Sequence, residues 1–224
     1  MGGTIGLSLD DPALHRVVED QCRTRGFEVL SGGRAHLDGL ITGGLPAVFV
    51  DDADAIVSTN VAGAASAIRH LVSYGHTRIA YLGGMRILTT QRDRHRGYLR
   101  AIGRRAGPEA HDLRDEAAAE RAAIAVLRGP APPTAIFAAQ HQITIGVVRA
   151  LRRLERTVAL VGFDDFTLAD LLEPAVTVVA QDPARMGRTA ALTLFERIDG
   201  DKSAPREIRI PTTLIPRGSG EIPI

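Results

Sequence analysis

Short runs of apolar residues alternate along this chain with longer stretches in which apolar residues recur at helical spacing. The run from Val158 to Val161 has four apolar residues in a row, two of them β-branched, which is typical of a strand buried on both faces. Gly162 is expected to end this strand, and Asp164 and Asp165 follow it. Ligands of open parallel sheets bind outside the carboxyl ends of the strands, so the pattern indicates a carboxylate at the edge of a crevice. The alternative is that both aspartates only form the turn.

Predicted strands and helices alternate through the whole chain, which favours a doubly wound α/β fold. Helices are expected to begin near Pro12, Asn60 and Thr89, because capping residues stand at each of these places. Residues 103–112 are polar and are predicted to be irregular. The predicted strands comprise residues 4–9, 27–30, 37–41, 47–50, 78–82, 135–138, 158–161 and 176–180, with a last extended segment over 208–215. Three further helices are predicted over residues 116–127, 143–153 and 183–198.

Two of the predicted connections are too short for this topology. Only residues 31–36 precede the strand 37–41, and only residues 42–46 precede the strand 47–50. A parallel crossover with its helix needs at least ~10–12 residues. Either these strands pair differently, or residues are missing around 31–37 and 42–46. We expect residues to be missing around 103–115 and 154–157 as well.

Length, charge and cysteine content narrow the class of protein. The 224 residues suit one or two domains with a sizeable core. The formal net charge is +1 and there is no long basic run, so we expect no DNA binding by the chain alone. Cys22 is the only cysteine, which agrees with a reducing compartment. There is no signal-peptide pattern and no bilayer-spanning apolar run, so we expect a soluble, cytoplasmic protein with no membrane partner.

Polar residues follow several of the predicted strands. Asp51 follows one strand, Gln140 and His141 follow another, and Gln181 follows a third. His141 could be a base or a metal ligand. No second His or Cys stands nearby at ligand spacing, so a plain polar contact is favoured, and we expect no metal and no cofactor. Gly83 and Gly84 lack the pattern of a phosphate-binding loop and are interpreted as a turn.

Several segments, in their order and spacing, resemble the effector-binding core of LacI/GalR-type transcriptional regulators. The resemblance implies two doubly wound parallel-sheet α/β lobes joined by three crossovers, the architecture of periplasmic sugar-binding proteins. Residues 1–57 plus 181–209 would form one lobe, and residues 58–180 plus 210–224 the other. The segments that carry the resemblance are residues 4–7, 37–41, 70–84, 133–137, 158–166, 177–182 and 211–218.

The resemblance also implies a binding site. The family's cleft arginine, three residues before a Gly-aromatic pair, corresponds to Arg94, and its strand-end aspartate corresponds to Asp164. Gln140 stands where the family has Asn or Asp, with His141 beside it. These groups suit a sugar, nucleoside or similar hydroxylated effector, because a carboxylate accepts hydroxyl hydrogen bonds and a guanidinium donates several. Less secure correspondences fall on Asp10, Asp51 and Gln181.

The chain also departs from the family pattern. The family's N-terminal helix-turn-helix and hinge helix are absent, so operator DNA would be bound only through a missing N-terminal domain. Helices that the family has between its second, third and fourth strands are absent too. A homodimer is expected, because operators are palindromic and apolar residues stand on a short connection. The residues expected at that interface are Leu168, Leu171 and Leu172, and the helix bearing Val147 and Leu151 could add to it.

Two other functions compete with a regulator. One is an exported sugar-binding protein of a transporter, which the missing signal peptide disfavours. The other is an enzyme, such as a hydrolase using Asp164 with His141. The sequence has no nucleophile elbow, metal cluster or phosphate loop, so we expect no enzymatic activity.

Overall fold

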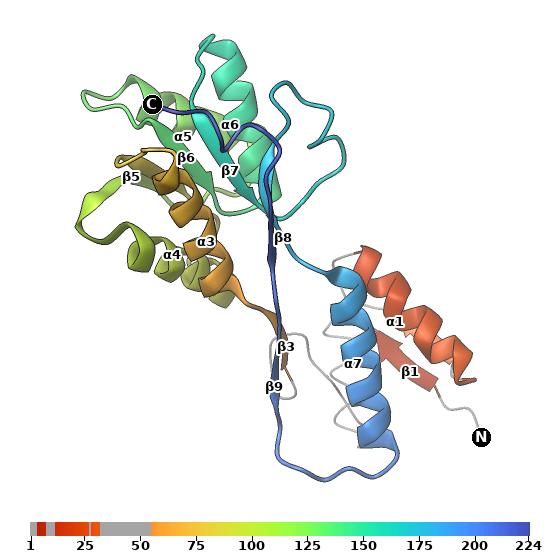
Figure 1. Cartoon of the computed structure of the whole chain (residues 1–224). Helices are drawn as coiled ribbons and strands as arrows, with labels where there is room; N and C mark the ends of the chain where they lie inside the picture. Colours follow the sequence, from red (N-terminus) through yellow and green to blue (C-terminus); the bar gives the residue numbers. More distant parts are fainter. Residues whose placement is uncertain (1–3, 8–11, 27, 32–54) are drawn as a thin grey trace. The chain divides into compact units, whose positions relative to one another are not determined.

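The computed structural model describes residues 4–7, 12–26, 28–31 and 55–224, and the side chains of residues 16–26 and 55–224 (Figure 1). The predicted strands 37–41 and 47–50, the short connections beside them, and the candidate residues Asp10 and Asp51 lie outside the described residues. Within the described residues, no helix combines the length and the apolar character that a membrane span requires.

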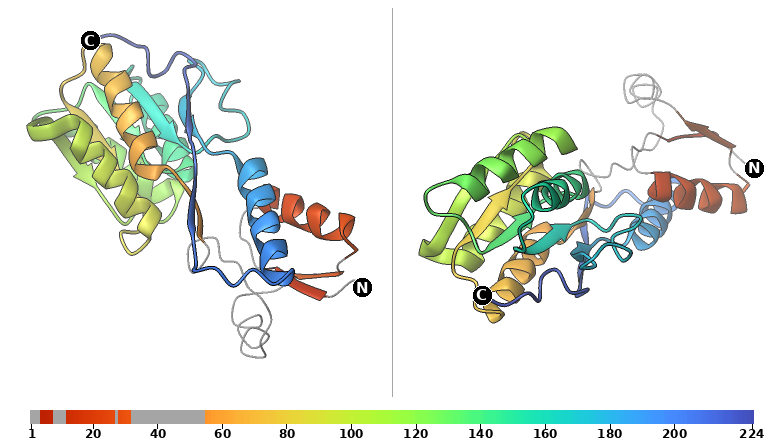
Figure 2. Two further views of the ribbon diagram at one scale, coloured as in Figure 1. Left: turned by 60° about the horizontal axis from the view of Figure 1, so that its bottom comes forward. Right: turned by 90° about the horizontal axis from the view of Figure 1, so that it is seen from above.

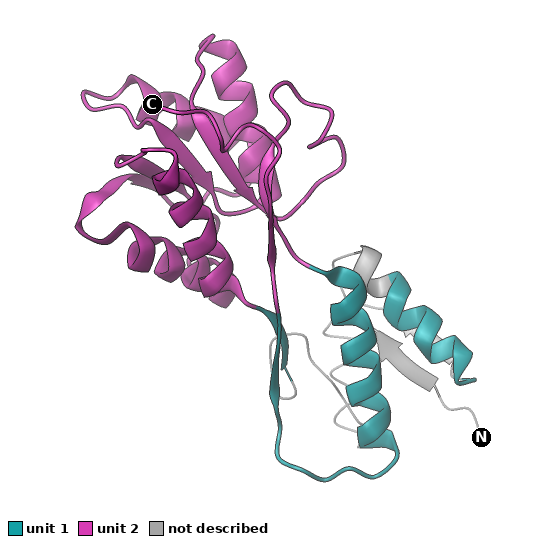
Figure 3. Ribbon diagram, in the orientation of Figure 1, with its two compact units in different colours: residues 1–58, 182–210 teal, residues 59–181, 211–224 magenta. Residues whose placement is uncertain are grey.

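The chain divides into two compact units (Figure 3). Unit 1 comprises residues 1–58 and 182–210, and unit 2 comprises residues 59–181 and 211–224. The chain therefore passes three times between the units, after residues 58, 181 and 210. Both units mix helices with parallel strand pairs, which confirms the predicted α/β fold class.

Unit 2 is built on a six-stranded sheet in the order β10-β8-β7-β6-β4-β5. All neighbouring strands are parallel except β10, which runs antiparallel to β8. In register, Leu82 stands beside Ala138, which stands beside Gly162, so the carboxyl ends of three central strands meet at one edge. The strands are β4 (Ile79–Leu82), β5 (Ala106–Ala110), β6 (Ala135–Ala138), β7 (Ala159–Phe163), β8 (Thr177–Ala180) and β10 (Thr213–Ile215).

Helices cover both faces of this sheet (Figure 2). The helices α3 (Asn60–Ser73) and α4 (Thr89–Ile102) pack on one face, and α5 (Glu116–Arg128) and α6 (His141–Arg153) pack on the other. Alternate residues of each strand point to opposite faces, as the strand period of two requires. This explains why the strands read as continuous apolar runs in the sequence.

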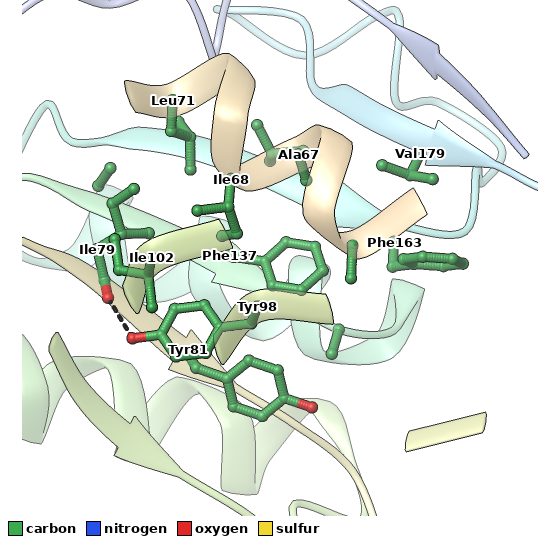
Figure 4. Close-up of a cluster of buried hydrophobic side chains, with 14 of the residues drawn as sticks. Ala67, Ile68, Leu71, Ile79, Tyr81, Tyr98, Ile102, Phe137, Phe163 and Val179 are labelled. Atoms are coloured by element: carbon green, nitrogen blue, oxygen red, sulfur yellow. Dashed lines mark hydrogen bonds between the residues drawn. The ribbon is translucent and has the colours of Figure 1, made fainter. Parts of the chain in front are cut away.

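The α3–α4 side of the sheet holds most of the aromatic core (Figure 4). Tyr81, Phe137 and Phe163 are fully buried there against residues of α3 such as Ile68. Tyr98 of α4 joins them, and its hydroxyl donates to the Ile79 carbonyl at 2.9 Å. Each such buried side chain contributes about 1.5–3 kcal/mol to folding, so this cluster holds α4 firmly against the sheet.

Within its described residues, unit 1 contains two short parallel strand pairs and two helices. Strand β1 (Thr4–Leu7) pairs with β2 (Glu28–Ser31), and β3 (Ala55–Ser58) pairs with β9 (Glu207–Ile210). The helices are α1 (Pro12–Thr24) and α7 (Pro183–Ile198), and α7 has Asp182 as its N-cap. Their core contains Val18, Cys22, Ile56, Met186, Ala190, Ala191, Leu194, Phe195 and Ile210.

Two connections differ from the sequence-based prediction. Residues 103–112 are not irregular throughout, because a 3₁₀ turn (Gly103–Arg105) leads into strand β5. This strand contains Gly107 and Pro108, which an edge strand tolerates. Between α6 and β7, Glu155 adopts a positive φ of 50° and its N–H donates to the Arg152 carbonyl. Both connections are thus short and locally ordered. The expectation of missing residues at 103–115 and 154–157 stays a prediction.

Several smaller predictions also need correction. Gly162 does not end its strand but lies inside β7, where an added Cβ would stand 2.6 Å from the Thr144 hydroxyl. Asn60 is the first residue of α3 and not its cap, which is Thr59. Val147 is fully buried in the core, so it is wrong as a surface residue of a dimer.

Candidate functional site

Arg94 is the centre of a buried polar group at the carboxyl ends of the strands of unit 2. It lies on the inner face of α4 and is only 4% exposed. The other two arginines of this stretch, Arg92 and Arg96, are exposed. A buried guanidinium is costly unless its charge and its N–H groups are paired, so the partners of Arg94 define the site.

The main partner of Arg94 is Asp164. Nη1 of Arg94 donates to Oδ2 of Asp164 at 2.9 Å, and Nη2 donates to Oδ1 at 3.2 Å. This is the parallel, two-bond geometry in which Arg and a carboxylate pair most strongly. The Asp164 side chain is 16% exposed, so part of the ion pair is in contact with solvent.

Backbone conformation places Asp164 in this position. The residue follows β7 directly and has a positive φ of 71°, a region that Asp visits more readily than most residues. Its N–H donates to the Val179 carbonyl of the neighbouring strand at 2.9 Å. The turn thus leaves the carboxylate at the end of the sheet, facing α4.

Three more groups complete the surroundings of the Arg94 guanidinium. Nε donates to Oδ1 of Asn60 at 2.9 Å, and Nη1 also donates to the Ala139 carbonyl at 2.8 Å. The guanidinium carbon lies 3.8 Å from the centre of the Phe163 ring, within cation–π distance. Strand β7, helix α3 and the residue that follows β6 therefore all contribute to holding one arginine.

Gln91, one turn before Arg94 on α4, forms hydrogen bonds to the residues that follow the same strands. Its Nε2 donates to the Ala139 carbonyl at 3.3 Å, and its Oε1 accepts from the Gly84 N–H at 2.9 Å. Its own carbonyl accepts from the Tyr81 hydroxyl at 3.4 Å. Burial raises the pKa of that hydroxyl well above its ordinary value, although the charge of Arg94 opposes the shift.

The structure brings some of the predicted residues together and leaves others apart. Gln181, at the end of β8, donates through Nε2 to Oδ1 of Asp164 at 2.6 Å, so it joins Arg94 and Asp164. Gln140 is half-buried as the N-cap residue of α6, with Oε1 2.9 Å from where a Gly84 Cβ would stand. It therefore lies at the same edge of the sheet. His141 is half-buried beside Gln140 and makes no hydrogen bond to this group among those described.

Asp165 has a different role from its neighbour. Its two carboxylate oxygens accept from the Arg217 guanidinium at 2.7 Å each, and the Phe166 N–H donates to Oδ1 at 3.0 Å. These bonds, the one from the Arg217 side chain first, hold the pKa of Asp165 below its usual range. Of the two adjacent aspartates, Asp165 thus fixes the local chain and Asp164 faces the polar group.

Three contributors to the site were not found from the sequence. Phe163 reads as an ordinary core residue, and Asn60 reads as a helix cap. Gln91 carries a weak signal, because it stands three residues before Arg94 and so shares its face of α4.

Comparisons with known proteins agree on one family. A family model described as a periplasmic binding protein-like domain matches residues 68–220. The HTH-type transcriptional regulator reg1 of Streptomyces lividans is 31% identical over 195 residues, which are 79% of this chain and 56% of that protein. The ribose operon repressor of Escherichia coli (strain K12) is 30% identical over 183 residues, 77% of this chain and 55% of the repressor. The chain thus spans about half the length of these curated relatives.

Solved structures show the same fold. The crystal structure of a LacI family transcriptional regulator from Enterococcus faecium with bound ribose has a TM-score of 0.81 at 20% identity, covering 96% of this chain and 98% of that one. A regulatory protein of the LacI family from Chloroflexus aggregans has a TM-score of 0.84 at 20% identity, again covering 96% and 98%. At these identities the similarity shows the fold.

Proposed function

Because this chain belongs to the periplasmic binding protein-like domain family and its relatives are LacI-type regulators, we propose that it is the effector-binding part of a LacI-family transcriptional regulator. The observation that carries the proposal is the buried pair of Arg94 and Asp164 at the carboxyl ends of the sheet. A buried ion pair adds little to stability compared with apolar residues of the same size. Its position at the ligand-binding edge of an open sheet favours a role in recognition.

The effector is a small hydroxylated molecule such as a sugar or a nucleoside. The carboxylate of Asp164 and the amide of Gln181 accept and donate hydrogen bonds where the ion pair meets solvent, and Gln140 and His141 stand at the next strand end. Two similar proteins agree with this chemistry, since one is named as a ribose operon repressor and one structure holds ribose. The regulator names of the relatives point away from an enzyme.

In this proposal, unit 1 and unit 2 are the two lobes that enclose the effector, and Asp10 and Asp51 contribute from unit 1. Ligand that touches both lobes favours their closed arrangement. The closed arrangement then changes operator binding by an N-terminal DNA-binding domain, in a cytoplasmic homodimer.

A thermal-shift screen over sugars, nucleosides and sugar phosphates finds the ligand, because binding raises the melting temperature. Calorimetric titration then compares the parent with Asp164→Asn. Loss of the carboxylate removes a charged acceptor and should weaken binding by about 2–4 kcal/mol, or roughly 30- to 1,000-fold.

Asp165→Asn is the matched control, since it alters the neighbouring aspartate that pairs with Arg217 instead. It should bind the ligand within about twofold of the parent. The melting temperatures of both variants show that unit 2 is folded during the titration. Equal affinity of the parent and Asp164→Asn, or no hit in the screen, would contradict the proposal.

A further inference from the structure

Two histidines and a glutamate converge on one point near the edge strand of unit 2. His95 comes from α4, Glu109 from β5, and His111 from the residue after β5 ends. Nε2 of His95 and Nε2 of His111 each lie 2.9 Å from the same oxygen, Oε2 of Glu109. The three potential ligand atoms all lie within 4.8 Å of one another.

Aromatic packing fixes the orientation of both imidazole rings. The ring centre of Tyr81 lies 4.8 Å from that of His95 and 5.3 Å from that of His111. The two imidazoles are 4.8 Å apart and nearly perpendicular, at 89°. Because Tyr81 is fully buried in the core, the rings rest on a rigid support and their Nε2 atoms are directed towards Glu109.

We propose that His95, Glu109 and His111 form a binding site for a divalent transition-metal ion, for which Zn²⁺ is the probe. Two imidazole nitrogens and one carboxylate oxygen are a donor set that binds Zn²⁺, with a fourth position open to water. The side chains are 28%, 25% and 18% exposed in that order, so an ion reaches them from solvent.

Two of the three distances between the ligand atoms require only a small adjustment. Tetrahedral bonds of about 2.0–2.1 Å place neighbouring ligand atoms roughly 3.3–3.4 Å apart. The two nitrogen–oxygen distances are 2.9 Å, so each has to widen by a few tenths of an ångström. Glu109 can make this shift more easily than a core residue could, because it lies on an edge strand and is not buried.

The site is separate from the polar group around Arg94. His95 follows Arg94 in the sequence, but its ring contacts Glu109 and Tyr81, whereas Arg94 contacts Asp164 and Asn60. The bound ion ties α4 to the edge strand β5, so it stabilises unit 2 whether or not an effector is present. The proposal therefore does not depend on the proposed function.

Calorimetric titration of the full chain with Zn²⁺ tests the site, using the parent, His111→Gln and Glu109→Gln. The parent should bind one Zn²⁺ per chain. Each variant should bind Zn²⁺ at least roughly 100-fold more weakly, because losing a direct ligand costs at least as much affinity as losing a residue that supports a ligand. His141→Gln is the matched control, since it removes a half-buried histidine that is not part of the cluster. Its affinity for Zn²⁺ should stay within about twofold of the parent.

Two further measurements distinguish a built site from loose binding. Added Zn²⁺ should raise the melting temperature of the parent and leave that of His111→Gln unchanged. Co²⁺ should give the parent a visible absorption band typical of a four-coordinate site, and Glu109→Gln should lose it. Equal Zn²⁺ affinity in the parent and both variants, or only millimolar binding by the parent, would mean that the cluster is a plain hydrogen-bonded group.

Discussion

At the residue scale, the fold makes different use of two adjacent aspartates. Asp164 has a positive φ and turns its carboxylate to buried Arg94, whereas Asp165 turns to Arg217. The sequence alone could not separate these roles, because both residues follow the same strand and both favour turns. Only the family resemblance pointed to Asp164.

The ion pair between Asp165 and Arg217 should contribute to stability in a pH-dependent way. The bond from the Arg217 side chain lowers the pKa of Asp165 below its value in the unfolded chain, which is about 3.9. A depressed pKa stabilises the folded state above the unfolded-state pKa, and this stabilisation is lost as the pH falls through the folded-state pKa. The Asp165 side chain is 37% exposed, so screening limits the contribution to about 1 kcal/mol or less.

We therefore expect Asp165→Asn to melt below the parent at pH 7, and the difference to shrink towards about pH 3. Melting curves of both proteins between these pH values measure the effect. Three other carboxylates also have lowered pKa values, namely Asp112, Asp201 and Glu221. Their contributions to the pH dependence cancel in the comparison because both proteins contain them. A difference that stays constant over the whole range would show that the ion pair does not couple to folding.

At the element scale, the sequence predicts those strands that are buried on both faces. Strand β6 was predicted with the correct bounds, and β4, β7 and β8 within two residues at either end, because each consists mainly of apolar residues. The strands β3 and β5 were missed. Strand β5 is an edge strand whose five residues include Gly and Pro, so it lacks the pattern that burial imposes.

The candidate site was predicted only in part for a related reason. Arg94, Asp164 and Gln181 were predicted and lie together, whereas Asn60 and Gln91 of the same polar group were not predicted. Asn60 stands 34 residues from Arg94, and only the packing of α3 against α4 brings them together. Local patterns cannot show such contacts, and the cluster of His95 with Glu109, 14 residues apart, was missed for the same reason.

The contact between α3 and α4 depends on Gly97. A Cβ built on Gly97 would stand 2.3 Å from the Val61 carbonyl oxygen and 2.8 Å from the Ala64 Cβ. Alanine improves helix propensity by about 1 kcal/mol, but the clash involves a backbone oxygen that cannot turn away. We expect the cost of the clash to exceed the gain in helix propensity. Gly97→Ala should therefore lower the free energy of unfolding, measured by urea titration, by about 1–3 kcal/mol.

Gly129→Ala is the matched control for this experiment. The nearest atom to a Cβ at Gly129 is 3.4 Å away, an ordinary contact, and its φ of −62° suits alanine. Its unfolding free energy should differ from that of the parent by no more than about 0.5 kcal/mol. If Gly97→Ala is as stable as the parent, α3 and α4 are not held in close contact at this glycine.

At the scale of the whole molecule, the predicted dimer surface includes exposed leucines of unit 2. Leu168 and Leu171 lie in the connection from β7 to β8 and are 57% and 75% exposed. Leu172, in contrast, packs partly against the core, as does Leu151. The predicted dimer surface is therefore smaller than the sequence indicated, and Leu171 is its most exposed member.

We expect the chain to form a two-fold dimer through this surface, which sedimentation equilibrium at high micromolar concentration would detect. In a two-fold dimer each substitution acts twice, and burying a leucine is worth about 1.5–3 kcal/mol, so Leu171→Glu should weaken association roughly 100-fold or more. Leu192→Glu is the matched control, because Leu192 is 50% exposed on α7 of unit 1. It should leave the association constant within about twofold of the parent. A parent that sediments only as a monomer would refute the dimer, and equal weakening by both variants would place the interface elsewhere.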